Sequence, residues 1–276
     1  MGIDTSNTLV PVRDGRVGLH TVGNGPGLVI VHGSAVRASD YRRFTEALSH
    51  RYTVHIYDRR GRATSSAACD PYSIAAEIDD LAAVLTFTEA SNVFGHSYGG
   101  YIALAAAHRL QPANVAVYDP AVSISGGFPT EFIEPFAEAV GRRDHSRAFG
   151  LLNRGLGTTG ALSRLPPTAQ AGLGGLFLRT PMGRRWADLL PTVVAETRAV
   201  RDGDAATEAY SMITAETALF HGGRSPRYFG SSCEELASCL PNARSYSIRG
   251  AGHDAPNRAD RRLIAALVRF FSPESR

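Results

Sequence analysis

The stretch from Ser91 to Gly100, SNVFGHSYGG, joins a predicted strand to a predicted helix through one tight turn. A short apolar run leads into Gly95-His96-Ser97-Tyr98-Gly99, and an Ala- and Leu-rich stretch follows it without a linker. This context of strand, turn and helix is the one in which the serine of G-x-S-x-G is presented as a nucleophile. The flanking glycines permit strained backbone angles and close neighbours. We therefore predict Ser97 as a nucleophile at the start of a helix, where the dipole favours negative charge.

Three further segments accompany this turn: HGSA from His32, YDRRGR from Tyr57 and GAGHD from Gly250. Together with GHSYGG, they resemble the α/β-hydrolase fold superfamily, in the branch of small esterase-like and haloperoxidase-like enzymes with a helical cap. The resemblance extends over residues 10–271 and is weakest across residues 123–210. It implies an α/β-hydrolase fold with a helical cap inserted after the strand that follows the helix of the serine turn.

The spacing of apolar residues predicts the same class of fold. An opening hairpin over residues 9–22 is followed by short apolar runs at residues 28–31, 52–57, 93–94 and 115–118, which alternate with helical patterns. Such alternation is typical of a mostly parallel, doubly wound sheet, whose functional crevice lies at the carboxyl ends of the strands. On the helix predicted from Ser73 to Phe87, we expect Glu77, Asp79 and Asp80 to form a solvated face.

Residues 123–214 differ in character from the rest of the chain. Pro, Gly and Arg are frequent there, no run resembles a core strand, and helical patterns occur at residues 131–140, 184–190 and 193–200. We interpret residues 123–214 as a helical cap, and residues 1–122 and 215–276 as the core. The cap holds apolar side chains that either line a substrate pocket or form the cap's own core: Phe128, Phe132, Phe136, Phe149, Leu176, Phe177 and Trp186.

A serine hydroxyl needs a base to take its proton, and histidine has a suitable pKa near neutral pH. The sheet is predicted to resume at residues 217–221 and 244–248, and His253 follows the second of these strands. The order of serine first and histidine last is that of the resembled superfamily. We therefore predict His253 as the base. Of the other eight histidines, His32 and His96 are expected to support their motifs, and the remaining six have no partner that the sequence reveals.

The acid that orients this base departs from the common pattern. Many relatives carry an Asp after the strand before the last one, but Ser225 stands at that position and cannot be an anion. Some relatives place the acid after the strand that follows the serine helix, where this chain has Asp119. Asp254, adjacent to the base, is the rival. Glu216 lies at the wrong end of the strand predicted at residues 217–221. We predict Asp119 as the acid.

Acyl transfer also needs donors for the oxyanion of the tetrahedral intermediate. The resemblance implies that the backbone N–H groups of Ser34 and Tyr98 supply them. It implies no metal and no cofactor.

Composition is ordinary for a globular protein of 276 residues, with 43% hydrophobic and 20% charged residues. The basic residues are scattered despite a net charge of +3, so we expect no nucleic-acid partner. Three widely spaced cysteines predict neither a disulfide framework nor a zinc site. No apolar run approaches the ~20 residues of a membrane span, and no leader pattern is present, so we expect a cytoplasmic protein.

These features predict a serine hydrolase that cleaves an ester, or another acyl bond, of a small molecule through an acyl-enzyme on Ser97. A first alternative is a non-hydrolytic enzyme of the same fold: a lyase, a cyclase of secondary metabolism or a cofactor-free perhydrolase. A second is a ligand receptor that retains the three residues. The substrate and the oligomeric state are left open.

Overall fold

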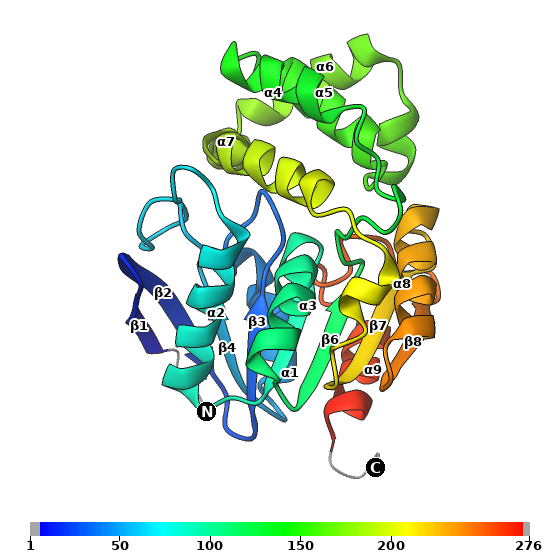
Figure 1. Ribbon diagram of the computed structural model, residues 1–276. Helices are drawn as coiled ribbons and strands as arrows, with labels where there is room; N and C mark the ends of the chain where they lie inside the picture. Colours follow the sequence, from blue (N-terminus) through cyan, green and yellow to red (C-terminus); the bar gives the residue numbers. More distant parts are fainter. Residues whose placement is uncertain (1–5, 273–276) are drawn as a thin grey trace.

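The computed structural model describes residues 6–272 and contains one eight-stranded sheet (Figure 1). The strand order is β1-β2-β4-β3-β5-β6-β7-β8, with β2 antiparallel to β1 and β4 and every pair from β4 to β8 parallel. The strands are β1 (Ser6–Val12), β2 (Gly15–Val22), β3 (Gly27–Val31), β4 (Thr53–Tyr57), β5 (Asn92–His96), β6 (Asn114–Tyr118), β7 (Glu216–Gly222) and β8 (Ala243–Ile248). The predicted doubly wound, mostly parallel sheet is confirmed.

Helices cover both faces of this sheet. They are α1 (Arg42–Leu48), α2 (Ile74–Thr88), α3 (Tyr98–Leu110), α4 (Ile133–Gly141), α5 (His145–Leu156), α6 (Pro167–Leu178), α7 (Pro181–Asp202), α8 (Arg227–Cys239) and α9 (Arg261–Phe271), with 3₁₀ helices η1 (Ala38–Tyr41), η2 (Gly160–Arg164) and η3 (Thr207–Tyr210). Within residues 6–272, no helix is both long and apolar enough to cross a membrane.

The central strands are apolar throughout because each of their faces meets a helical layer. In β3, Val29 and Val31 join one apolar cluster with α2, α3 and α8, whereas Leu28 and Ile30 join a second with α1 and α9. All four side chains are fully buried. Alternate residues of a strand point to opposite faces, so an uninterrupted apolar run fits only a strand covered on both sides.

Four helices, α4 to α7, lie above the carboxyl ends of the central strands, with α7 next to the sheet and the others beyond it (Figure 1). They come from the chain between β6 and β7, which is the proposed cap. Helix α7 is continuous over 22 residues through Pro191, although the sequence indicated two separate helices there. Proline removes one hydrogen bond of a helix without always ending it. Helices α5 and α6 were not anticipated.

The expectation of a solvated acidic face on α2 is wrong for two of its three residues. Glu77 and Asp80 are buried, at 4% and 0% exposure, and bind Arg59 and Arg60 respectively. Asp79 is partly exposed and pairs with Arg109 on α3. Burial of a charge requires a partner of opposite charge. Glu77 and Asp80 can be buried because the loop after β4 brings their arginine partners against α2.

The turn between β5 and α3 packs closely against neighbouring backbone. A Cβ placed on Gly99 would lie 2.1 Å from the Val31 carbonyl oxygen, and one on Gly95 would lie 2.4 Å from the Gly99 carbonyl oxygen. Ser97 between them has φ 55° and ψ −121°. The glycines therefore let the serine turn rest directly against the end of β3.

We predict that Gly99→Ala lowers the free energy of unfolding by about 2 kcal/mol or more, because neither of the clashing groups is a movable side chain. Urea unfolding followed by circular dichroism measures this. Gly172 on α6 is the control, since a Cβ there meets nothing within 4 Å. Gly172→Ala should leave the stability unchanged or raise it by about 0.5 kcal/mol. Equal stability of Gly99→Ala and the unaltered chain would contradict the close approach.

Candidate active site

Ser97, His253 and Asp119 come together at the carboxyl ends of β5, β8 and β6. The Ser97 hydroxyl lies 3.1 Å from His253 Nε2, and His253 Nδ1 lies 3.0 Å from Asp119 Oδ2. Asp119 is fully buried, and the His253 side chain is 17% exposed. Ser97 can therefore donate to the imidazole while the opposite N–H donates to the carboxylate, which is the geometry of nucleophile, base and orienting acid.

Asp119 is held as a carboxylate acceptor from three sides. Oδ1 accepts the Gly222 N–H at 2.9 Å, and Oδ2 accepts the Ser225 hydroxyl at 2.6 Å in addition to the His253 N–H. Ser225, at the position where many relatives carry the acid, thus serves Asp119 instead. The rival Asp254 is about half exposed and pairs with Arg258.

The two residues expected to bind the oxyanion flank Ser97. Ser34 follows β3, Tyr98 begins α3, and Ser34, Ser97, Tyr98 and His253 line one cavity. The Ser97 N–H donates to the Tyr118 carbonyl at 3.0 Å. Within residues 6–272, the backbone N–H groups of Ser34 and Tyr98 donate to no protein group. Both remain available for an oxygen placed in the cavity.

His96 and Tyr41 connect the Ser34 loop to the His253 loop. The Gly33 N–H donates to the Tyr41 hydroxyl at 3.2 Å, that hydroxyl donates to His96 Nδ1, and His96 Nε2–H donates to the His253 carbonyl at 2.9 Å. The sequence predicted a supporting role for His96 but did not identify Tyr41. Tyr41 lies on η1, eight residues after Gly33 but far in sequence from His253, and no local pattern marks it.

The cavity beside Ser97 has a volume of about 190 Å³ and a mostly apolar lining. Three of the aromatic residues expected for a pocket line it: Phe128, Phe149 and Trp186. Helix α7 contributes Trp186, Val193, Thr197 and Val200 from one of its faces. Four of the aromatic and apolar residues named as pocket candidates do not line it: Phe132 and Phe136 are buried in the core, Leu176 is exposed, and Phe177 faces a neighbouring hollow.

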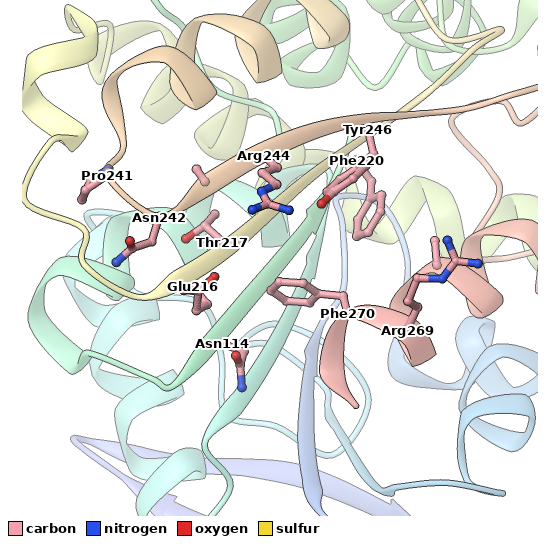
Figure 2. Close-up of a pocket in the computed structure, with 12 residues that line it drawn as sticks. Asn114, Glu216, Thr217, Phe220, Pro241, Asn242, Arg244, Tyr246, Arg269 and Phe270 are labelled. Carbon is pink, nitrogen blue, oxygen red and sulfur yellow. The ribbon is translucent and has the colours of Figure 1, made fainter. Parts of the chain in front are cut away.

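A larger groove, of about 750 Å³, lies at the opposite end of the sheet (Figure 2). It is bordered by the first residues of β6 and β7, by Arg244 and Tyr246 of β8, and by Phe270 of α9. Glu216, one of the carboxylates considered for the acid, is in this groove and not beside His253. None of the predicted site residues borders it, so the smaller cavity is the candidate active site.

Comparison with known proteins identifies the family. The model of the alpha/beta hydrolase family matches residues 28–267, which include all five predicted site residues. The chain belongs to the α/β-hydrolase family. Among the described residues, no group of three or more His, Cys, Asp or Glu side chains is arranged to hold a metal ion.

This α/β-hydrolase chain is similar to several known proteins. A crystal structure of an alpha/beta hydrolase from Sphaerobacter thermophilus DSM 20745 is 25% identical, with a TM-score of 0.79 over 96% of this chain and 100% of that one. The naproxen esterase of Bacillus subtilis is 15% identical, with a TM-score of 0.70 over 98% and 92%. The uncharacterized hydrolase YraK of Bacillus subtilis (strain 168) is 28% identical over 54% of this chain and 58% of its own length.

Two buried histidines near the site of this α/β-hydrolase are neutral. Burial lowers the pKa of His96 well below 6.5, and the neighbouring His253 lowers it further. Burial, followed by the charges of Arg62 and Arg59, lowers the pKa of His32 in the same way. His32 Nδ1 donates to the Gly33 carbonyl and Nε2 accepts the Arg59 N–H. Each ring therefore acts as one donor and one acceptor, a pattern that protonation would destroy.

We predict that the free energy of unfolding decreases as the pH falls below about 6.5, because the unfolded chain then protonates both histidines while the folded chain keeps them neutral. His96→Asn should reduce the slope by about 1.4 kcal/mol per pH unit, the value for one proton. Urea unfolding at several pH values from about 7 to 5 measures the slope. The exposed His108→Asn should leave it unchanged. An unaltered slope in His96→Asn would show that His96 is not a neutral buried group.

Proposed function

We propose that this protein is a serine hydrolase that cleaves an ester, or another acyl bond, of a small organic molecule through an acyl-enzyme on Ser97. The observation that carries the proposal is the relay of short contacts from the Ser97 hydroxyl through His253 to the buried Asp119. The Ser97 hydroxyl faces a cavity that is also lined by Ser34 and Tyr98. The backbone N–H groups of these two residues have no acceptor among the described residues. Family membership and the resemblance to a naproxen esterase in fold agree with it.

In the proposed reaction, Ser97 Oγ attacks the acyl carbon while His253 Nε2 takes the hydroxyl proton. The N–H groups of Ser34 and Tyr98 stabilise the oxyanion that forms. His253 then returns the proton to the leaving group, and the acyl group stays on Ser97. Water attacks this acyl-enzyme with His253 again as the base, the bond between the acyl carbon and Ser97 Oγ breaks, the acid leaves, and His253 returns the proton to Ser97 Oγ. Asp119 keeps the imidazole in the required tautomer and stabilises its protonated form.

The cavity favours a small apolar acyl group as substrate. Its volume of about 190 Å³ lies below the usual range of ligand pockets, which begins at about 300 Å³. The proposed cap supplies Phe149 and Trp186 to the lining, and the His253 ring stacks on Phe229 with centroids 4.9 Å apart. We expect short aliphatic or single-ring acyl groups to fit. A neutral acyl chain is preferred, because no Asp, Glu, Lys or Arg side chain lines the cavity.

We predict that a fluorophosphonate modifies Ser97 and that Ser97→Ala abolishes both labelling and ester turnover. Peptide mass spectrometry locates the modified residue, and a melting curve verifies the fold of the variant. Labelling of intact protein that turns over no member of an ester panel would favour a non-hydrolytic use of the site. Full turnover by Ser97→Ala would end the proposal of a serine nucleophile.

We predict that Asp119→Asn lowers kcat by about 10² to 10⁴, since the equivalent change in serine proteases costs about 10⁴. Ser225→Ala should cost much less, because Asp119 keeps its charge and the Gly222 N–H. Asp254→Asn should be close to neutral, because that side chain pairs with Arg258 at the surface. Steady-state kinetics on the three variants decides the matter. Asp254→Asn as the most impaired variant would refute the assignment of Asp119.

A further inference from the structure

A single carboxylate of the proposed cap is buried under the loop that carries Ser34. Glu196 on α7 is fully buried, and its Oε1 accepts from Arg59 Nη2 at 2.7 Å and from Arg62 Nη2 at 2.6 Å. Burial raises the pKa of Glu196, but the two arginines outweigh burial and lower it, so the group is a carboxylate. The same oxygen thus fixes two guanidinium groups that come from the loop after β4.

The two arginines bind the backbone on both sides of Ser34. Arg59 Nη1 donates to the Gly33 carbonyl at 3.4 Å, and Arg62 Nε donates to the Val36 carbonyl at 3.1 Å. The Ser34 hydroxyl also approaches the Glu196 carboxylate and contributes to the lowering of its pKa, although Oε2 has no partner with good hydrogen-bond geometry among the described residues. The charge cluster therefore holds the backbone carbonyl groups on both sides of Ser34.

Arg59 also contacts the residue that carries the second oxyanion donor. Its guanidinium carbon lies 4.8 Å from the centroid of the Tyr98 ring, a cation–π distance. The Tyr98 hydroxyl lies 2.7 Å from the Tyr72 hydroxyl, which donates to Glu77, the second carboxylate bound to Arg59. One cation thus touches both elements of the oxyanion site, and Glu196 helps to hold that cation.

The same loop contains a second buried ion pair without these contacts. Arg60 binds Asp80 through Nε at 2.7 Å and Nη2 at 2.8 Å. Among the described residues, its guanidinium otherwise donates to the Arg13 carbonyl, in the turn between β1 and β2, and to no group of the Ser34 loop or of Tyr98. A buried pair that only stabilises the loop is therefore available for comparison, on the same helix that supplies Glu77.

We propose that Glu196 is a positioning residue of the active site, which orients the N–H groups of Ser34 and Tyr98 through Arg59 and Arg62. The inference rests on the proposed function, because it assigns those N–H groups to oxyanion binding. It couples the cap to catalysis: α7 delivers Glu196 to the oxyanion loop and lines the acyl cavity with Val193 and Thr197. The packing of the cap on the core and the orientation of the two N–H donors are therefore coupled.

The test compares Glu196→Gln with Asp80→Asn, which both remove one buried negative charge and keep the side-chain shape. Glu196→Gln should lower kcat for a small aryl ester by about 10- to 100-fold and change KM by no more than about threefold. This is the loss expected when hydrogen-bond donors to the oxyanion move by up to about 1 Å. Asp80→Asn should retain kcat within about twofold, whatever its melting temperature.

Inhibitor affinity separates positioning from general destabilisation. A trifluoromethyl ketone forms an oxyanion with a serine, whereas the matching methyl ketone binds as a neutral ground-state analogue. Glu196→Gln should weaken the first by about tenfold or more and leave the second unchanged, because only the adduct uses the two N–H groups. If Glu196→Gln does not fold, Arg62→Lys receives the same measurements, since an ammonium group cannot bind Glu196 and the Val36 carbonyl with one planar fork.

A folded Glu196→Gln with wild-type kcat and wild-type affinity for the trifluoromethyl ketone overturns the inference. An equal loss of kcat in Asp80→Asn also overturns it, because any buried carboxylate that pairs with an arginine of this loop would then have the same effect. For Arg62→Lys, unchanged kcat has the same meaning. Failure of the unaltered protein to form the ketone adduct or to be labelled on Ser97 is a separate result, which refutes the proposed function and the inference with it.

Discussion

The close contact between the Ser97 turn and the end of β3 is the constraint on which the site depends. Gly99 allows the turn to touch the Val31 carbonyl, and this contact places Ser97 beside the loop that begins at His32. Parallel strands bring their carboxyl ends to one edge of the sheet, so Ser34, Ser97 and Asp119 meet there without any further device. The fold thus assembles the polar groups before any substrate contact.

Two buried polar networks hold the loops around that edge. The first runs from Gly33 through Tyr41 and His96 to the His253 carbonyl and is made of neutral groups. The second contains Arg59, Arg62 and their carboxylates and is made of charges. A buried polar group without a partner is costly, so each network stabilises one arrangement of the loops that it joins. These two buried networks therefore preorganise the site.

Helix α7 serves both the apolar and the charged part of the site. Val193, Thr197 and Val200 face the cavity, and Glu196 reaches the arginines of the core from the same side of the helix. Glutamate at a core-facing position of an amphipathic helix is rare without a partner. The signal for Glu196 was present in the spacing of α7, but the sequence did not reveal which cation it meets.

By itself, the sequence determined the alternation of strands and helices in a mostly parallel sheet and the serine turn, because these follow from local patterns of apolar residues and glycines. It also selected Ser97, His253 and Asp119, whose roles stay predictions. Only the tertiary structure decided that Glu77 and Asp80 are buried, that Ser225 donates to Asp119 and that Glu196 joins Arg59. Helical spacing shows which face a side chain occupies. It does not show what covers that face, because the covering groups come from distant parts of the chain.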